Sequence, residues 1–188
     1  MDAAAVHARY PNLFQVVDNE TAHRQFEAIA SPPPEPLISN VNVVPFAEDK
    51  CIVLRLEDGS WELPGGTLEP GEDYRSALRR ELLEEAGAEL VSAFVPFGAW
   101  RTDSRADRPY RPHLPHPVSY RLVGYGDVRL VSVPAIPETG GERVEVVAAV
   151  TTAEAAEHFR SCGRSDLAEL YLLAAALRAG QQGGTEGG

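Results

Sequence analysis

Residues 63–88 read LPGGTLEPGEDYRSALRRELLEEAGA and carry the strongest structural signal in the chain. Asp73 is a good N-cap for a helix, because its side chain can accept hydrogen bonds from the free backbone N–H groups of the first turn. Gly87 stands where a residue in the left-handed conformation would end that helix. The stretch therefore predicts about three and a half turns of helix, preceded by a tight Pro-Gly-Gly turn.

The predicted helix presents three carboxylates on one face. Glu81, Glu84 and Glu85 are spaced i, i+3 and i+4, so their side chains are neighbours on the helix surface. Like charges at this spacing destabilise a helix unless something neutralises them. An apolar stripe beside the carboxylates, suited to packing on a sheet, consists of Leu78, Leu82 and Ala86.

The acidic face has two interpretations. It is either an ordinary solvated helix face or a site for a cation. We expect Arg79 and Arg80 to lie off this face and not to form an i, i+4 ladder with it. The Pro-Gly-Gly turn adds bare backbone carbonyls just before the helix, and clustered oxygen ligands suit Mg²⁺ or Mn²⁺. These features favour the cation site.

The same stretch resembles the signature of the Nudix hydrolase family. That signature is a Gly, five residues, a Glu, seven residues, and then Arg-Glu-U-x-Glu-Glu-x-Gly-U, where U is aliphatic. The matching positions are Gly66, Glu72, Arg80, Glu81, Leu82, Glu84, Glu85, Gly87 and Ala88, of which Ala88 is smaller than the usual residue. The resemblance implies an α/β fold, an α/β/α sandwich with a mixed sheet.

The resemblance also implies a metal site that uses Mg²⁺ or Mn²⁺. Glu84 and Glu85 would be the main metal ligands, and Glu81 a further ligand or the general base. The backbone carbonyl of Gly65 or Gly66 would complete the coordination shell. Metal ions that bridge carboxylates and phosphate oxygens offset the charge of a diphosphate and lower the pKa of an attacking water.

Two further roles follow from the resemblance. Arg80 would pair with Glu72 and so aim Glu81, without contacting substrate. Members of the family often use one more acidic residue from a distant loop. We expect Glu142 in that role, with Glu138 as the second candidate, since both lie before the last predicted strand. The alternative is that both are ordinary surface acids.

A long loop is predicted over residues 102–117, and its basic residues are candidates for substrate binding. Arginine suits bidentate recognition of phosphate, so the loop could bind substrate. The alternative is an ordinary polar surface loop. Two histidines in the loop, His113 and His116, are three residues apart, but a zinc site would need further ligands. We therefore expect surface or substrate contacts for them. The candidate arginines are Arg105, Arg108 and Arg111, flanked by Arg101 and Arg121.

The rest of the chain divides into three parts. Residues 1–36 form an N-terminal extension, with a helix expected from Asn19 to Ala30 and a stiff Pro-rich connector over 31–36. Residues 37–180 form the Nudix-type domain. Strands are expected at 38–46, 51–56, 61–63, 90–101, 118–131 and 144–150, and helices at 152–161 and 166–180. Residues 181–188 are Gly-rich and are expected to be disordered.

Composition limits the partners. The 188 residues carry a formal net charge of −11, which disfavours polymeric nucleic acid but not a small phosphorylated metabolite screened by a metal ion. The only cysteines, Cys51 and Cys162, fit a reducing compartment. No apolar segment reaches transmembrane length, so no membrane partner is expected. We expect a cytoplasmic protein, and a homodimer is compatible with the sequence.

The function implied by the resemblance is metal-dependent pyrophosphohydrolysis. Water would attack phosphorus in the diphosphate linkage of a nucleoside diphosphate that is joined to another moiety. Nucleotide sugars, dinucleotides and nucleoside triphosphates all remain open. The alternative is a Nudix-type ligand sensor or regulator without catalytic activity. The complete signature favours the enzyme, since sensors of this kind usually have a degraded one.

Overall fold

A computed structural model of the chain describes residues 3–132 and 144–185. The elements, in chain order, are α1 (Ala3–Arg9), β1 (Val17–Asp18), β2 (Ala22–Ala28), the short 3₁₀ helix η1 (Glu35–Leu37), β3 (Ile38–Ala47), β4 (Lys50–Leu56), β5 (Trp61–Glu62), β6 (Gly65–Thr67), α2 (Tyr74–Ala86), β7 (Ala88–Leu90), β8 (Val95–Ser104), β9 (Val118–Leu130), β10 (Val144–Val150), α3 (Thr152–Ser161) and α4 (Ser165–Thr185).

One mixed sheet organises these elements. Its strand order is β1-β2-β8-β9-β3-β4-β10, while the short strands β5, β6 and β7 pair with β4, β3 and β9. The central pair β3–β9 is parallel, and the other pairs in the described residues are antiparallel. The expectation of a mixed sheet is confirmed.

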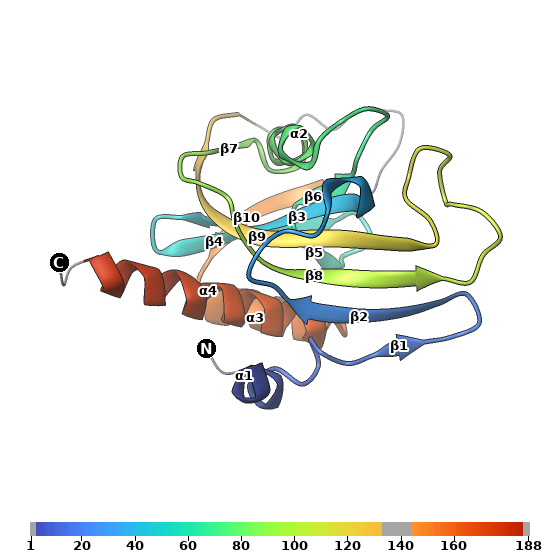
Figure 1. Ribbon diagram of the computed structural model, residues 1–188. Coiled ribbons are helices and arrows are strands. Elements are labelled where there is room, and N and C mark those ends of the chain that lie inside the picture. Colours follow the sequence, from blue (N-terminus) through green and yellow to red (C-terminus); the bar gives the residue numbers. More distant parts are fainter. Residues whose placement is uncertain (1–2, 133–143, 186–188) are drawn as a thin grey trace.

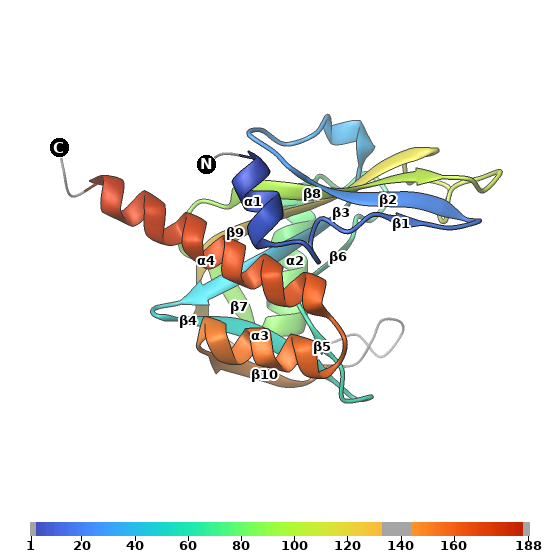
Figure 2. The same cartoon turned by 90° about the horizontal axis from the view of Figure 1, so that it is seen from below.

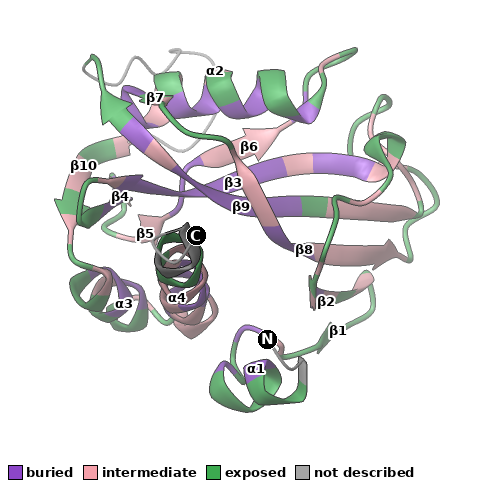
Figure 3. Cartoon of the chain, turned by 60° about the vertical axis from the view of Figure 1, so that its left-hand side comes forward, coloured by how far each residue is buried: buried purple, intermediate pink, exposed green. Residues whose placement is uncertain are grey.

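Helices cover both faces of the sheet (Figure 1). On one face, the apolar side of α2 packs on β3, β4 and β9, around Leu78, Leu82 and Leu122. On the other face, α3 and α4 enclose a second core, with Phe159 and Tyr171 at its centre. Figure 3 shows the buried residues concentrated in the middle of the sheet and on the inner sides of these helices. The chain is therefore an α/β/α sandwich.

The helix predicted within residues 63–88 is α2, and both of its ends are fixed as expected. The Asp73 carboxylate accepts hydrogen bonds from the backbone N–H groups of Arg75 and Ser76. Gly87 ends the helix in the left-handed conformation, with φ of 59°. The apolar stripe is buried, so the acidic face is turned toward the Gly-Gly turn of β6.

The helix predicted from Asn19 to Ala30 is wrong, because residues 22–28 form β2. Asn19 makes a turn instead of a helix cap, its side chain accepting hydrogen bonds from the N–H groups of Thr21 and Ala22. β2 then pairs with β8 along its whole length. A neighbouring strand edge supplied hydrogen bonds that the sequence alone does not reveal. The N-terminal extension thus adds β1 and β2 to the edge of the same sheet.

Other boundaries also differ from expectation. The strand predicted over 90–101, with an interruption around Pro96 and Gly98, overlaps the end of β7 and most of β8, which both pair with β9. The interruption corresponds to a register shift in the β8–β9 pairing between Pro96 and Gly98. The last helix begins at Ser165 and continues to Thr185, past Gly180, so residues 181–185 are helical and not disordered. Helix α1 was not predicted; it lies near α4 (Figure 2), and its Val6 is buried in the same core as residues of α4. No helix in the described ranges is long and apolar enough to span a membrane.

Candidate functional site

Arg80 connects the acidic helix to the loop that precedes it. Its Nε and Nη2 atoms donate to the two carboxylate oxygens of Glu72 at 3.1 and 3.0 Å, a bidentate pair. Nη1 donates to Glu81 Oε1 at 2.8 Å. The Glu72 carboxylate also accepts from the backbone N–H of Glu69, and the guanidinium group lowers the pKa of Glu72. The expected pair between Arg80 and Glu72 is therefore present, while the role of Arg80 in aiming Glu81 stays a prediction.

One expectation about Arg80 is wrong. Its Nη1 also lies 3.4 Å from Glu84 Oε2, an i, i+4 contact with the acidic face. The backbone of Arg80 lies beside the acidic face, but its side chain is long enough to reach across to Glu84. The position of the backbone alone therefore does not predict this contact. Arg80 therefore neutralises part of the repulsion between Glu81 and Glu84.

The Gly-Gly turn of β6 is shaped around the Glu81 carboxylate. A Cβ atom placed on Gly66 would lie 2.0 Å from Glu81 Oε1, so a larger side chain has no room there. Gly65 has φ of 140°, and a Cβ on it would lie 2.2 Å from the carbonyl oxygen of Val41. Both glycines let the turn approach the acidic helix and β3 at once.

Glu85 is held against the same turn. Its Oε2 accepts a hydrogen bond from the backbone N–H of Gly65 at 2.9 Å. Burial raises the pKa of Glu85 to about 8, and the Gly65 hydrogen bond opposes that rise only in part. Burial also raises the pKa of Glu81, against the opposing effect of Arg80. The two carboxylates are therefore poorly compensated in the absence of a cation.

The donor set fits Mg²⁺ or Mn²⁺, which take oxygen ligands. Two partly buried carboxylates with raised pKa values and the unpartnered buried Oδ1 of Asn42 lie around one turn. Within the described residues, however, no three acidic, His or Cys side chains converge on one point. Glu81 and Glu84 face Arg80, while Glu85 faces Gly65. Backbone carbonyls, water or substrate oxygens would have to complete a coordination shell.

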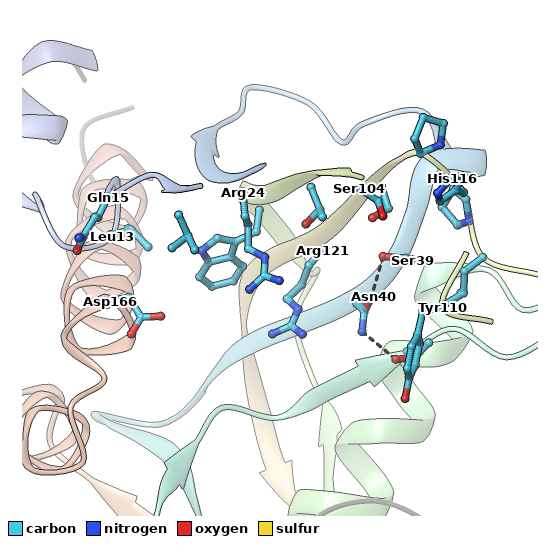
Figure 4. Close-up of a pocket in the computed structure, with 18 of the residues that line it drawn as sticks. Leu13, Gln15, Arg24, Ser39, Asn40, Ser104, Tyr110, His116, Arg121 and Asp166 are labelled. Carbon is cyan, nitrogen blue, oxygen red and sulfur yellow. Dashed lines mark hydrogen bonds between the residues drawn. The ribbon is translucent and has the colours of Figure 1, made fainter. Parts of the chain in front are cut away.

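Two cavities meet beside this turn. The smaller, of about 270 Å³, is lined by Asn42, Gly65, Gly66 and Glu85 among others. The larger, of about 640 Å³, extends across the sheet toward α4 and the N-terminal segment. Asn40 and Arg121 line both cavities, so the two adjoin one another. Two hydrogen bonds hold the Asn40 side chain in place: its Oδ1 accepts from the Ser39 hydroxyl, and its Nδ2 donates to the Thr67 hydroxyl (Figure 4).

The three loop arginines do not line either cavity. Arg105 pairs with Asp18 at 2.7 Å and with the carbonyl of Asn19, and thereby holds the β1–β2 turn. Arg108 is exposed, and Arg111 lies 5.7 Å from the ring centre of Tyr110. The arginines that do line the large cavity are Arg24, Arg121 and Arg164. Arg24 was not predicted, because it lies in the segment assigned to a helix.

The remaining candidates are two histidines of the 102–117 loop and two glutamates that precede β10. His113 Nε2 lies 2.9 Å from the carbonyl oxygen of Leu68, and His116 Nε2 lies 2.8 Å from that of Ala106. The Nε2 atom of each histidine is thus within hydrogen-bond distance of a backbone carbonyl. Glu138 and Glu142 lie outside the described residues, so their role stays a prediction.

Comparison with known proteins identifies the family. A model of the NUDIX domain matches residues 36–171. The nucleoside triphosphatase NudI of Enterobacter sp. (strain 638) is 49% identical over 47 residues, 25% of this chain and 33% of that protein. NudI of Salmonella arizonae is 45% identical over the same length. The chain thus spans about a third of the length of these relatives.

A solved structure supports the fold. The NUDIX hydrolase from Nitrosomonas europaea has 21% sequence identity and a TM-score of 0.53, covering 74% of this chain and 89% of that one. The domain match begins just before β3 and ends within α4, and so includes the acidic helix and the Gly-Gly turn. The chain therefore belongs to the NUDIX domain family.

Proposed function

We propose that this protein hydrolyses a diphosphate linkage in a nucleoside diphosphate joined to another moiety, with Mg²⁺ or Mn²⁺. One observation carries the proposal: the carboxylates of Glu81 and Glu85 are partly buried, with raised pKa values, around a glycine turn that opens into a cavity. A solvated acidic face would not bury these groups. The known relatives NudI carry the name nucleoside triphosphatase, so nucleoside triphosphates belong among the substrates to test.

The residues have distinct roles in this proposal. Glu84 and Glu85 would hold the metal, with the carbonyl of Gly65 or Gly66. Arg80, anchored by Glu72, fixes the position of Glu81. Glu81 is either a further ligand or the base that takes a proton from the attacking water; its raised pKa suits a base. The bound metal would offset phosphate charge and lower the pKa of the water.

The expected partner is a small phosphorylated metabolite. The net charge of −11 continues to disfavour polymeric nucleic acid. Both cysteines are free thiols, and the expected reducing, cytoplasmic environment stays a prediction.

The direct test is turnover of a panel of nucleotide sugars, dinucleotides and nucleoside triphosphates, with Mg²⁺, with Mn²⁺ and with a chelator. We expect hydrolysis of at least one class with metal, measured as inorganic phosphate after a coupling phosphatase or pyrophosphatase acts on the products, and none with chelator. Binding of a panel member without turnover under any condition would favour a ligand sensor over an enzyme.

Glu85→Gln tests the metal site itself. It keeps the side-chain shape but removes the charge, so it should reduce turnover by about two orders of magnitude or more. It should also shrink the rise in melting temperature that Mg²⁺ produces by binding only the folded state. The matched control is Glu89→Gln, since Glu89 is exposed just beyond the helix. An undiminished Mg²⁺ shift in the Glu85 variant would remove Glu85 from the site.

A further inference from the structure

Two arginines from distant parts of the chain lie on one face of the sheet. Arg24 belongs to β2 and Arg121 to β9, and β8 runs between them. In register, Arg24 lies opposite Thr102, and Arg121 lies opposite Trp100. All four residues line the 640 Å³ cavity. Figure 4 shows both guanidinium groups pointing into this cavity, close to one another.

Neither guanidinium group has a hydrogen-bond or ion-pair partner among the described residues, and both face the same space. Their neighbour Arg164 differs, because it pairs with Glu62 and, at 3.1 Å, with Asp166. The three arginines carry three positive charges, and Glu62 and Asp166 offset two of them, so one net positive charge is left beside the cavity. Both side chains are exposed to solvent. The protein atoms packed around Arg121 and the positive charge of Arg24 nevertheless lower the pKa of Arg121, while Glu62 and Asp166 act in the opposite direction. A bound anion would relieve this unfavourable arrangement.

The arginine pair adjoins the proposed reaction site. Arg121 lines the smaller cavity together with Gly65, Gly66 and Glu85. It also lies opposite Asn40 of β3, which in turn lies opposite Thr67 of β6. A polar path therefore runs across the sheet from the arginine pair to the glycine turn. An extended substrate could place one end at each.

We propose that Arg24 and Arg121 form a binding site for a second anionic group of the substrate, a phosphate beyond the linkage that is cleaved. Two forked guanidinium groups suit a phosphate, which can accept several charge-assisted hydrogen bonds. This inference rests on the proposed function. Arg24 lies outside the residues that match the family, 36–171, whereas Arg121 lies within them.

The first test measures phosphate binding without metal or turnover. Inorganic phosphate is titrated calorimetrically into the full-length chain in chelator. Arg24→Gln and Arg121→Gln should each weaken binding about tenfold or more, since a charged hydrogen-bond partner is lost. Arg129→Gln is the matched control, removing an exposed arginine from the far end of β9. No binding by the unmodified protein, or equal affinity in all four proteins, would overturn the proposal.

The second test uses turnover. Arg121→Gln should raise KM for a nucleoside triphosphate about tenfold with little change in kcat, and change KM less for a nucleoside diphosphate joined to a neutral sugar. Equal KM effects on both substrates would contradict the assignment. Arg121→Lys is a second variant for the case that Arg121→Gln disturbs folding. It keeps the positive charge but loses the forked guanidinium group, so its KM should lie between those of the unmodified protein and Arg121→Gln. Because phosphate binding needs no catalysis, failure of this site and failure of the proposed function are distinguishable.

Discussion

Gly66 is the residue whose side-chain size most directly controls the position of Glu81. Since a Cβ at this position would lie 2.0 Å from Glu81 Oε1, Gly66→Ala must push the carboxylate away. The displaced atom is the end of a flexible side chain, so the free energy of unfolding should change by only about 1 kcal/mol. Turnover should fall at least tenfold, because small displacements of positioned groups are costly in catalysis.

Steady-state kinetics and thermal melting of the Gly66 variant check this prediction. Gly180→Ala serves as a control, because a Cβ there meets nothing within 4 Å and Gly180 lies in α4, away from the site. It should leave kcat unchanged. If Gly66→Ala lost stability but kept full activity, the assigned function of the glycine turn would be wrong.

Glu85 should make the stability of the metal-free protein depend on pH. Its pKa is about 8 in the folded state against an ordinary value of 4.5, so the folded state holds the proton more tightly than the unfolded state. The associated stability is present below about pH 4.5 and is lost as pH rises through about 8. Relative to Glu85→Gln, the protein should lose on the order of 2–4 kcal/mol across that window.

Chemical denaturation in chelator at pH 5, 6.5 and 8 measures this difference for both proteins. Comparison with the Gln variant isolates Glu85 from Glu81, whose pKa is raised in the same direction. Mg²⁺ should bind more tightly as pH rises, because its ligands must be deprotonated. Parallel pH curves for the two proteins would show that Glu85 is ionised normally.

At the scale of elements, α4 fastens the N-terminal segment over the large cavity. The Glu169 carboxylate accepts hydrogen bonds from the Asn12 side chain and, at 2.8 Å, from the backbone N–H of Leu13. Asn12 and Leu13 both line the cavity. Glu169→Gln weakens this connection, because the amide lacks the charge that strengthens both hydrogen bonds. Amide exchange at Leu13 should accelerate about tenfold, equivalent to about 1.4 kcal/mol.

Hydrogen exchange followed residue by residue is the measurement. Glu157→Gln provides the comparison, since that glutamate is exposed on α3 and pairs only locally with Arg160 among the described contacts. Unchanged protection of Leu13 in the Glu169 variant would mean that apolar packing alone holds the segment.

At the scale of the whole molecule, the N-terminal extension belongs to the core. Val6, Tyr10, Leu13 and Phe26 are all buried among the residues that α4 covers. Removal of residues 1–30 would delete these side chains and expose the edge of β8, which pairs with β2. We expect the melting temperature to fall by more than about 10 °C, since several buried apolar side chains are each worth about 2 kcal/mol, and we expect aggregation through the exposed strand edge.

Thermal melting and size-exclusion chromatography of the truncated chain provide the check. The control is a chain without residues 1–2, which keeps the buried side chains of the extension. A chain without residues 1–30 that melts within about 2 °C of the full-length protein would show that the extension is an independent addition.

The sequence by itself determined the central part of this protein, because its signals are local. The cap at Asp73, the stop at Gly87 and the spacing of Glu81, Glu84 and Glu85 depend only on residues within one helix. The mixed sheet and its two covering layers followed from the resemblance carried by that same stretch.

The tertiary structure alone decided everything that depends on distant partners. Residues 22–28 form a strand because the edge of β8 is available, and no residue within the segment encodes that edge. Arg24 reaches the cavity for the same reason, whereas the three loop arginines, chosen for their clustering in sequence, lie outside it. The raised pKa of Glu85 arises from burial against the turn at Gly65. Burial depends on how layers pack, and the spacing of residues along one chain does not specify it.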